Sequence, residues 1–166
     1  VFLIPRNAFM PAEHEVVLRP FRPDDLPALV DVYMAAYRDF PEYGEPDEVH
    51  ALRYLQWLQR HHTLFLVAEV EGQPVGFIVV DANWRDWNGR RIGEIHELAV
   101  HPEYWGRSIA RRLLDAAMNH IRAEGLQQAG LWVGVRNERA QSFYRRIGFR
   151  RSGKPWGAWI KMVKSL

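Results

Sequence analysis

The segment from Glu94 to Ala110 (EIHELAVHPEYWGRSIA) combines acid–base side chains with a turn that could bind a phosphate. It is typical of a strand, a short turn after Pro102 and the start of a helix. The first turn of a helix leaves backbone N–H groups unpaired and carries partial positive charge, so it can hold a phosphate. Gly106, Ser108 and Ala110 are small and allow close approach to the backbone. Three basic residues add positive charge: Arg107, Arg111 and Arg112.

A second polar pair lies further along the chain, where Asn137 ends a predicted strand and Tyr144 follows in the next predicted helix. Asparagine is a favoured residue for capping the start of a helix. Seven residues of helix span about two turns, or ~10.5 Å along one face. We therefore expect the Asn137 amide and the Tyr144 phenol to line the same edge of an opening in the sheet.

Three titratable side chains lie on the strand that precedes the phosphate-binding turn: Glu94, His96 and Glu97. Alternate residues of a regular strand share a face, so Glu94 and His96 should point the same way. Glu97 should point the other way unless a bulge intervenes. A carboxylate or a neutral imidazole on such a strand could act as a general base. The alternative is the ordinary polar alternation of a half-exposed strand.

The hydrophobic pattern predicts an α/β fold with a mixed, mostly antiparallel seven-stranded sheet and four helices, in the order β-αα-βββ-α-β-α-ββ. An Asn88-Gly89 hairpin turn should join the third and fourth strands. Asp24 or Asp25 should cap the first helix. Residues 1–14 are predicted to form an arm, and residues 15–166 a single domain. The predicted strands are 16–19, 63–70, 75–81, 91–100, 130–135, 149–152 and 159–163. The predicted helices begin near residues 25 and 47 and cover 108–124 and 138–147.

The composition excludes several classes of protein. A chain of 166 residues with 48% hydrophobic and 25% charged residues is typical of one globular domain rather than a disordered or fibrous chain. The absence of cysteine excludes disulfides, thiolate metal ligands and a cysteine nucleophile. No apolar run reaches the ~20 residues that cross a bilayer. The start of the chain, Val1 to Pro5, is too short and too quickly broken for a secretory signal. We therefore expect a soluble, cytoplasmic protein with no metal and no membrane partner.

Charged and aromatic residues are unevenly distributed, although the net charge is only +2. Acidic residues gather between Asp39 and Glu48, without a basic residue among them, and the chain after residue 144 is basic. Both runs could be solvated faces, or the acidic run could bind a cationic substrate and the basic run a polyanion. Most of the seven tryptophans are expected in the core. Trp84 and Trp87 are candidates for the border of a substrate site.

Together, the two polar segments resemble the GNAT superfamily of acyl-CoA-dependent N-acetyltransferases. The resemblance covers nearly the whole chain, from Val16 to about Val163, including the order of the elements. In that family, a Gln/Arg-x-x-Gly-x-Gly/Ala loop binds the pyrophosphate of acetyl-CoA through backbone amides. The matching positions here are Trp105, Gly106, Arg107, Ser108, Ile109 and Ala110.

The match to the loop has two departures, and the match to the downstream segment has none. Trp105 replaces the Gln or Arg, and Ser108 replaces the first Gly, although its hydroxyl could itself donate to a phosphate. The downstream segment fits the family pattern without a gap. Its matching residues are Val133, Asn137, Ala140, Phe143, Tyr144, Gly148 and Phe149.

The resemblance implies a V-shaped split between the strand at 98–100 and the strand that ends at Asn137. The pantetheine arm of acetyl-CoA would pair with the backbone of Leu98 and Val100, contact Asn137 and bring the thioester to Tyr144. Glu94 matches the glutamate base of histone-type members, and His96 matches a catalytic histidine of aralkylamine-type members. The cofactor-binding residues implied are Leu98, Ala99, Val100, the loop residues Trp105, Gly106, Arg107, Ser108, Ile109 and Ala110, then Arg111, Asn137, Phe143 and Tyr144.

The implied reaction is direct transfer of the acetyl group to a primary amine, either a small cationic amine or a protein amine, in a ternary complex. Such an amine has a pKa near 10.4 and arrives protonated, so Glu94, His96 or a water chain must remove a proton. The backbone N–H of Leu98 could stabilise the oxyanion, and Tyr144 could protonate the leaving thiolate. The residues expected on the acceptor side are Glu42, Glu45 and Glu97.

Other functions stay open. The departures at Trp105 and Ser108 would suit a non-catalytic acyl-CoA-binding or regulatory module, and a second alternative is an acyltransferase that uses another acyl-CoA. Nucleic-acid binding through the basic tail is not expected, because no recognised binding motif accompanies it. Assembly as a homodimer is also left open.

Overall fold

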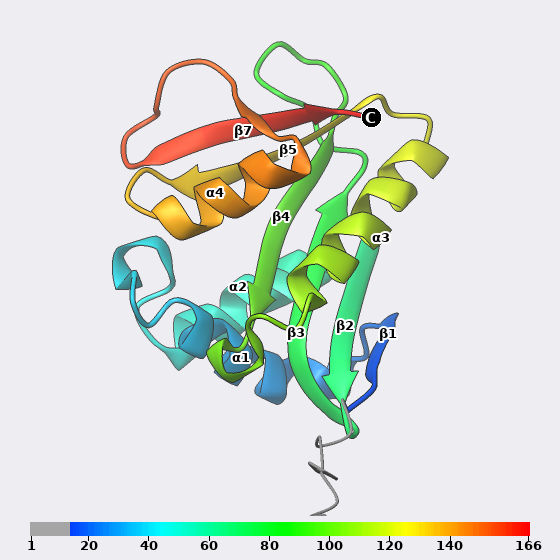
Figure 1. The fold of residues 1–166 in the computed structure, drawn as a ribbon, viewed down its shortest axis with the longest axis vertical. Helices are drawn as coiled ribbons and strands as arrows, with labels where there is room; N and C mark the ends of the chain where they lie inside the picture. Colours follow the sequence, from blue (N-terminus) through cyan, green and yellow to red (C-terminus); the bar gives the residue numbers. More distant parts are fainter. Residues whose placement is uncertain (1–13) are drawn as a thin grey trace, which may run out of the picture.

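The computed structural model describes residues 14–166 and contains the predicted order of elements (Figure 1). The predicted arm of residues 1–14 lies outside the described part of the chain, apart from His14. The strands are β1 (Val16–Pro20), β2 (Leu64–Val70), β3 (Gln73–Asp81), β4 (Gly93–Val100), β5 (Gln128–Gly134), β6 (Arg150–Arg151) and β7 (Trp159–Ser165). The helices are α1 (Leu26–Ala36), α2 (Glu48–Arg60), α3 (Ile109–Ala123) and α4 (Glu138–Ile147).

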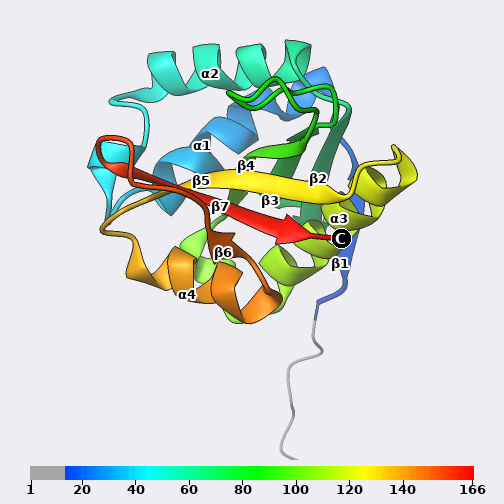
Figure 2. The same cartoon turned by 90° about the horizontal axis from the view of Figure 1, so that it is seen from above.

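The seven strands form one sheet in the order β1-β2-β3-β4-β5-β7-β6. Every neighbouring pair is antiparallel except β4 and β5, which are parallel. This arrangement confirms the predicted mixed, mostly antiparallel α/β sheet. Seen from above, α1 and α2 lie on one side of the sheet, and α3 and α4 lie on the other (Figure 2).

Two hydrophobic clusters hold the helices to the sheet, and β3 contributes to both. Ile78 and Val80 pack in the cluster with α3 and α4, whereas Phe77 and Val79 pack in the cluster with α1 and α2. A strand that is covered on both faces carries apolar residues at successive positions rather than at alternate ones. Residues 75–80 therefore form a continuous buried run.

The starts of α1 and α2 are held in different ways. Asp47 caps α2, because its carboxylate accepts a hydrogen bond from the backbone of His50 at 2.9 Å. The expected cap of α1 is wrong. Asp25 directly precedes that helix but makes no capping bond. It forms a buried ion pair with Arg19 at 2.7 Å, which lowers the pKa of the Asp25 carboxyl.

The connection between β3 and β4 is longer than the predicted hairpin turn. Asn88 and Gly89 lie at the tip of a loop that an isolated bridge between Arg85 and Arg91 closes, and Gly89 has a φ of +73°. The Asp86 carboxylate holds this tip by accepting a hydrogen bond from the backbone of Asn88 at 2.9 Å. The loop is therefore an ordered excursion from the sheet rather than a tight hairpin.

The expectation that the tryptophans are mostly core residues is wrong. All seven lie in the described part of the chain, and none is fully buried. Trp87 and Trp156 are 71% and 67% exposed, and Trp84 is 37% exposed. The interior is filled by aliphatic side chains, phenylalanine and a few tyrosines instead.

A bulge in β4 decides which side chains face the α1–α2 side of the sheet. Val80 on β3 pairs with Ile95 and Val79 pairs with Glu97, so His96 has no partner across the strands. Such an extra residue reverses the alternation after it. Ile95 and Leu98 consequently pack in the same cluster with α3, and Glu97 joins His96 on the opposite side. The exception foreseen for Glu97 therefore occurs.

The close contact between β4 and α3 gives a test of the packing. A Cβ on Gly93 would lie 2.5 Å from the Ile121 side chain. We expect Gly93→Ala to lower the free energy of unfolding by about 1–3 kcal/mol through overpacking, measured by urea unfolding. In an Ile121→Ala background, Gly93→Ala should lower the free energy of unfolding much less. An equal cost in both backgrounds would contradict this contact as the cause.

Candidate active site

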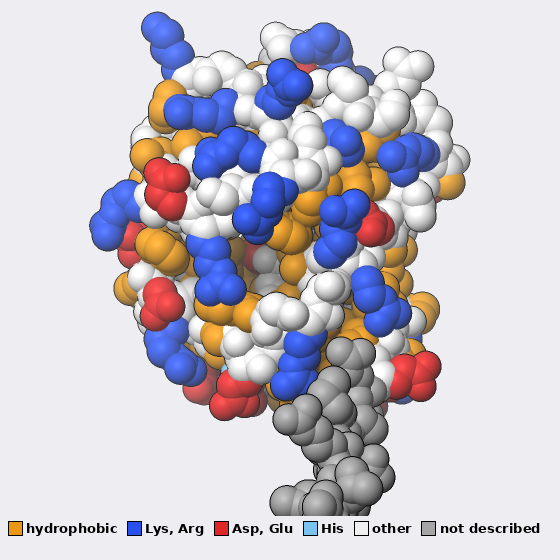
Figure 3. Space-filling view, viewed as in Figure 1, with side chains coloured by type: hydrophobic (Ala, Val, Ile, Leu, Met, Phe, Trp, Pro, Cys, Tyr) orange, Lys and Arg blue, Asp and Glu red, His pale blue; other side chains and the backbone are white. Residues whose placement is uncertain are grey.

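A large cavity follows the line where β4 and β5 separate. The two parallel strands pair only at Gly93 with Ala129 and at Glu94 with Gly130. Beyond those pairs lies a cavity of about 1010 Å³, which extends from the loop before α3 to the segment between α1 and α2. Figure 3 shows a hollow on the face that carries α3 and α4, with Lys and Arg side chains around it.

The loop before α3 exposes backbone amides at one end of the cavity. Gly106 and Ser108 both have a left-handed backbone, with φ of +78° and +60°. The Ser108 side chain makes no capping bond to α3, so its hydroxyl and the first amides of the helix lie at the cavity wall. Trp105 fixes this loop. Its indole N–H donates to the Val100 carbonyl at 2.8 Å, and the guanidinium of Arg139 lies 3.7 Å from its ring centroid.

The two ends of the cavity carry opposite charges. Arg111, Arg139 and Arg146 line the end near α3 and α4. The acidic residues of the lining, Asp39, Glu45 and Glu97, come from the α1–α2 segment and from β4. The cavity can therefore hold an anionic group at one end and a cationic group at the other.

Polar bonds fix the end of β5, where Asn137 lies. The Asn137 side chain caps α4 by accepting a hydrogen bond from the backbone of Ala140 at 3.1 Å. Gln141 is buried, and its amide donates to the carbonyls of Gly134 and Val135 at 2.9 and 2.8 Å. These bonds hold the start of α4 beside the cleft, so Asn137 is both the predicted cap and part of the cavity lining.

Tyr144 reaches the cavity from α4. Its ring packs edge-on against Phe143 and Phe149, with centroids 5.3 and 5.7 Å away. Burial raises the pKa of the Tyr144 phenol well above its usual value, and the negative charge of Glu97 raises it further. The phenol is therefore protonated at neutral pH and can donate a hydrogen bond into the cavity.

Glu97 is a buried carboxyl that two tyrosines hold in place. Tyr37, at the C-terminal end of α1, and Tyr54 on α2 donate hydrogen bonds to its two oxygens at 2.8 and 3.2 Å. Burial raises the pKa of Glu97 to about 7, although these phenols and the backbone N–H of Leu98 act in the opposite direction. A group with this pKa is well matched to general base catalysis near neutral pH.

The tyrosines around Glu97 are functional candidates that sequence reasoning missed. Tyr33, which also lines the cavity, accepts a hydrogen bond from the backbone of Glu45 at 3.0 Å, and its ring lies 4.8 Å from that of Tyr37. The four-residue spacing of Tyr33 and Tyr37 was the available signal, since it places both on one face of α1.

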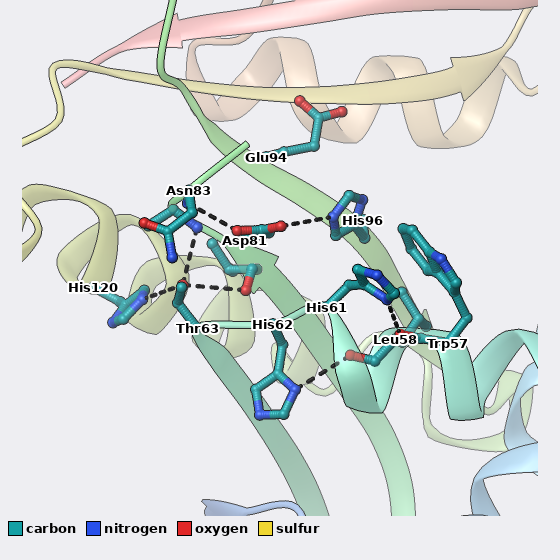
Figure 4. A network of polar contacts seen from close by, with 12 residues as sticks. Trp57, Leu58, His61, His62, Thr63, Asp81, Asn83, Glu94, His96 and His120 are labelled. Carbon is teal, nitrogen blue, oxygen red and sulfur yellow. Dashed lines mark hydrogen bonds and ion pairs between the residues drawn. The ribbon is translucent and has the colours of Figure 1, made fainter. Parts of the chain in front are cut away.

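His96 lines the cavity, and Figure 4 shows it between Asp81 and Trp57. The edges of Trp57 and Trp84 meet its ring at centroid distances of 5.1 and 4.8 Å. Its buried Nε2 makes no hydrogen bond and lies 3.7 Å from the Asp81 carboxylate. Burial lowers the pKa of His96, which keeps the imidazole neutral at pH 7. Asp81 was also missed, although its place at the end of β3 puts it beside β4.

Glu94 occupies a different place from His96 and Glu97. Its buried carboxylate forms an ion pair with Lys161 of β7 at 2.5 Å and is not part of the cavity lining. The residue between them on β5 is Gly130, where a Cβ would lie only 3.0 Å from the Lys161 side chain. Glycine at this position lets the lysine reach across β5 to β4, just where the two strands begin to separate.

The residues of the acidic segment between α1 and α2 make different contacts. Glu45 lines the cavity, whereas Glu42 forms an ion pair with Arg136 at 3.1 Å outside it. Between them, the buried Tyr43 crosses the open end of the cleft. Its hydroxyl accepts a hydrogen bond from the backbone of Arg136 at 2.9 Å, and its ring packs on Gly134.

Most of the residues expected at the site meet in this one cavity. Glu94, Arg107 and Glu42 do not line it; the guanidinium of Arg107 instead lies 4.9 Å from the ring centroid of Tyr104. The expected residues that do line the cavity are Glu45, His96, Glu97, Leu98, Ala99, Val100, Trp105, Gly106, Ser108, Ile109, Ala110, Arg111, Asn137, Phe143 and Tyr144.

Two further findings apply to residues 14–166 alone. No group of three or more His, Asp or Glu side chains there could hold a metal ion. In the same part of the chain, no helix is both long and apolar enough to pass through a membrane.

Comparison with known proteins agrees with this geometry. Residues 26–149 match the model of the acetyltransferase (GNAT) family. The N-acetyltransferase MJ1207 of Methanocaldococcus jannaschii, itself uncharacterized, is 38% identical over 90% of this chain and 66% of its own length. A mycothiol acetyltransferase of Propionibacterium freudenreichii is 36% identical over 87% of this chain. The match covers 46% of that relative, so the chain spans only part of the length of both proteins.

Solved structures share the whole fold. The crystal structure of PH1933 from Pyrococcus horikoshii superposes with a TM-score of 0.83 and 33% identity, covering 92% of this chain and 99% of that one. The PaiA N-acetyltransferase of Thermoplasma acidophilum, solved in complex with coenzyme A, has a TM-score of 0.74 at 23% identity, with the same coverage. The family match, the relatives and the split sheet agree, and the chain belongs to the GNAT family of acyl-CoA-dependent acetyltransferases.

Proposed function

We propose that this chain transfers an acetyl group from acetyl-CoA to a primary amine while both substrates are bound. The observation that carries the proposal is the single cavity that has Glu97 and Tyr144 in its lining and opposite charges at its two ends. The donor end suits a diphosphate, because the loop with the left-handed Gly106 and Ser108 and the first turn of α3, whose backbone N–H groups have no partner within the helix, line the cavity there. The arginines at this end would neutralise the phosphates.

Glu97 is the side chain that we assign as the general base. The sequence favours Glu94 or His96, but the Glu94 carboxylate is occupied by Lys161, outside the cavity lining. Glu97 lines the cavity, and its pKa of about 7 lets the carboxylate form accept a proton at neutral pH. His96 lines the cavity as a neutral imidazole and is the second candidate.

The transfer needs a deprotonated amine and a stabilised leaving group. Once Glu97 has taken the ammonium proton, the amine nitrogen can form its bond to the thioester carbonyl carbon, and the carbon–sulfur bond breaks. Tyr144 donates a hydrogen bond and then its proton to the departing sulfur, which leaves as the free thiol. The nitrogen loses its second proton as the amide forms, and this proton restores the Tyr144 phenol through solvent, while Glu97 releases the first proton to solvent. The backbone N–H of Leu98 is a candidate donor to the carbonyl oxygen, although it also lies close to the Glu97 carboxylate.

The acceptor end favours a cationic amine. Asp39 and Glu45 line it, and the tyrosines of α1 and α2 surround it. Cations are attracted both to carboxylates and to the faces of aromatic rings.

A cytoplasmic location of the protein stays a prediction.

Replacement of Tyr144 tests the proposal directly. We expect Tyr144→Phe to lower kcat by about 10²-fold, because the hydrogen bond to the leaving sulfur is lost, while coenzyme A still binds. Thiol release from acetyl-CoA with a panel of primary amines measures kcat, and calorimetry measures coenzyme A binding. Tyr104→Phe, which removes a hydroxyl at the far end of the cavity, is the matched control. No coenzyme A binding to the unmodified chain would overturn the transferase proposal, and full activity of Tyr144→Phe would overturn the role of that residue.

The pH dependence identifies the base. For the unmodified chain, kcat/KM should rise with pH through about 7, because only the ionised form of Glu97 can accept a proton. Glu97→Gln should lower kcat/KM by about 10²–10⁴-fold and abolish that rise. In Glu94→Gln the rise should persist near the same pH. If His96→Ala abolishes the rise and Glu97→Gln preserves it, His96 is the base.

A further inference from the structure

Two exposed tryptophans and a half-buried one between them lie beside the acceptor end of the cavity. Trp87 comes from the β3–β4 loop, Trp132 from β5 and Trp156 from the β6–β7 loop. The ring of Trp132 lies between the other two, with centroids 5.8 Å from Trp87 and 6.4 Å from Trp156. We call these residues the tryptophan surface. Large apolar side chains exposed together on a folded domain are typical of interaction sites.

The backbone holds the two most exposed tryptophans firmly. Trp156 exchanges two backbone hydrogen bonds with Trp159, at 2.8 and 3.0 Å, and so lies in a closed turn. The loop that carries Trp87 is fixed by Asp86, which accepts hydrogen bonds from the backbone of Asn88 and Arg90, both at 2.9 Å. Rigid aromatic side chains lose little conformational freedom when they bind a partner.

The tryptophan surface continues the active-site cavity. Trp132 and Trp156 line the same cavity as Glu97, whereas Trp87 lies outside the lining and is 71% exposed. A small amine that is enclosed beside Glu97 would not reach Trp87. The surface therefore suits an acceptor that extends out of the cavity beyond its reacting amine.

Several basic side chains beside the tryptophan surface have a hydrogen-bond or ion-pair partner within the protein. Lys161 lies 5.3 Å from the Trp132 ring centroid but is paired with Glu94. Arg90 is paired with Asp86, and Arg85 donates to the Gly89 carbonyl at 2.7 Å. Lys154 is the exposed basic residue of the Trp156 loop. An apolar partner suits this surface better than a polyphosphate chain, which would need several free cations.

We propose that the acceptor is a polypeptide, and that residues next to its reacting amine bind in extended form on the tryptophan surface. This inference rests on the proposed acetyl transfer. An extended chain rises ~3.3 Å per residue and shows the same face at every second residue, so its contacts repeat at about 6.6 Å. The centroid spacings of 5.8 and 6.4 Å are close to this repeat. Tryptophan is also the residue type most enriched at the energetic centres of protein interfaces.

Peptide length provides the test. Each of the twenty amino acids is placed in turn as the first residue of an octapeptide that continues with alternating leucine and serine, and of the corresponding dipeptide. A second set of octapeptides has a blocked N-terminus and carries one central lysine. We expect kcat/KM for the best octapeptide to exceed that for its dipeptide. Trp87→Ala and Trp156→Ala should each lower this ratio by about tenfold. Val49→Ala, which truncates a 58% exposed side chain on α2, should preserve it.

Each other outcome overturns the inference. Three results would exclude a polypeptide on this surface. They are transfer to none of the peptides, equal kcat/KM for octapeptides and dipeptides, and an unchanged octapeptide-to-dipeptide ratio of kcat/KM in the tryptophan variants. The surface would instead be assigned to nucleic acid if the chain bound a single-stranded oligonucleotide in a salt-sensitive way, if Trp87→Ala abolished this binding, and if peptides showed no length preference. Coenzyme A binding and transfer to small amines would persist in these cases, which separates them from failure of the proposed acetyl transfer.

Discussion

The extra residue in β4 is the constraint on which the site depends. Because His96 has no partner on β3, Glu97 faces α1 and α2, where Tyr37 and Tyr54 bind its carboxylate. A bulge also bends and twists its strand. The last pair between β4 and β5 lies two residues earlier, at Glu94. One local irregularity thus accompanies both the opening of the cleft and the placement of the titratable group beside it.

Burial then gives the groups at the site their chemical character. Burial raises the pKa of both carboxyl groups, that of Glu97 to about 7, and at Glu94 the ammonium group of Lys161 acts in the opposite direction. Burial acts in the opposite direction on a base, so it lowers the pKa of His96. Three titratable groups within four residues of sequence therefore have three different environments: a phenol-bound carboxyl, an ion pair and a neutral imidazole.

Sequence reasoning predicted the elements well, because long periodic segments and their caps are local properties. The order of strands and helices and the Asn137 cap agree with the expectation from the residues, and the parting of β4 from β5 agrees with what the family resemblance implies. The sequence named a bulge before Glu97 as a condition but could not show that it occurs, and the pairing of Glu94 could not be foreseen, since it depends on a lysine that reaches across Gly130 from another strand. The exposure of the tryptophans was missed because hydrophobicity alone does not distinguish a core residue from a surface that binds a partner.

The cleft is braced at both of its ends. At the vertex, the Glu94–Lys161 pair ties β4 to β7 across β5. At the open end, Tyr43 fastens the α1–α2 segment to the backbone after β5. With both ends fixed, the width of the slot is set before a ligand arrives, and little free energy is needed to separate the strands on binding. The backbone therefore sets the shape of the cleft in advance, and an extended thioester arm could enter it without rearrangement of the strands.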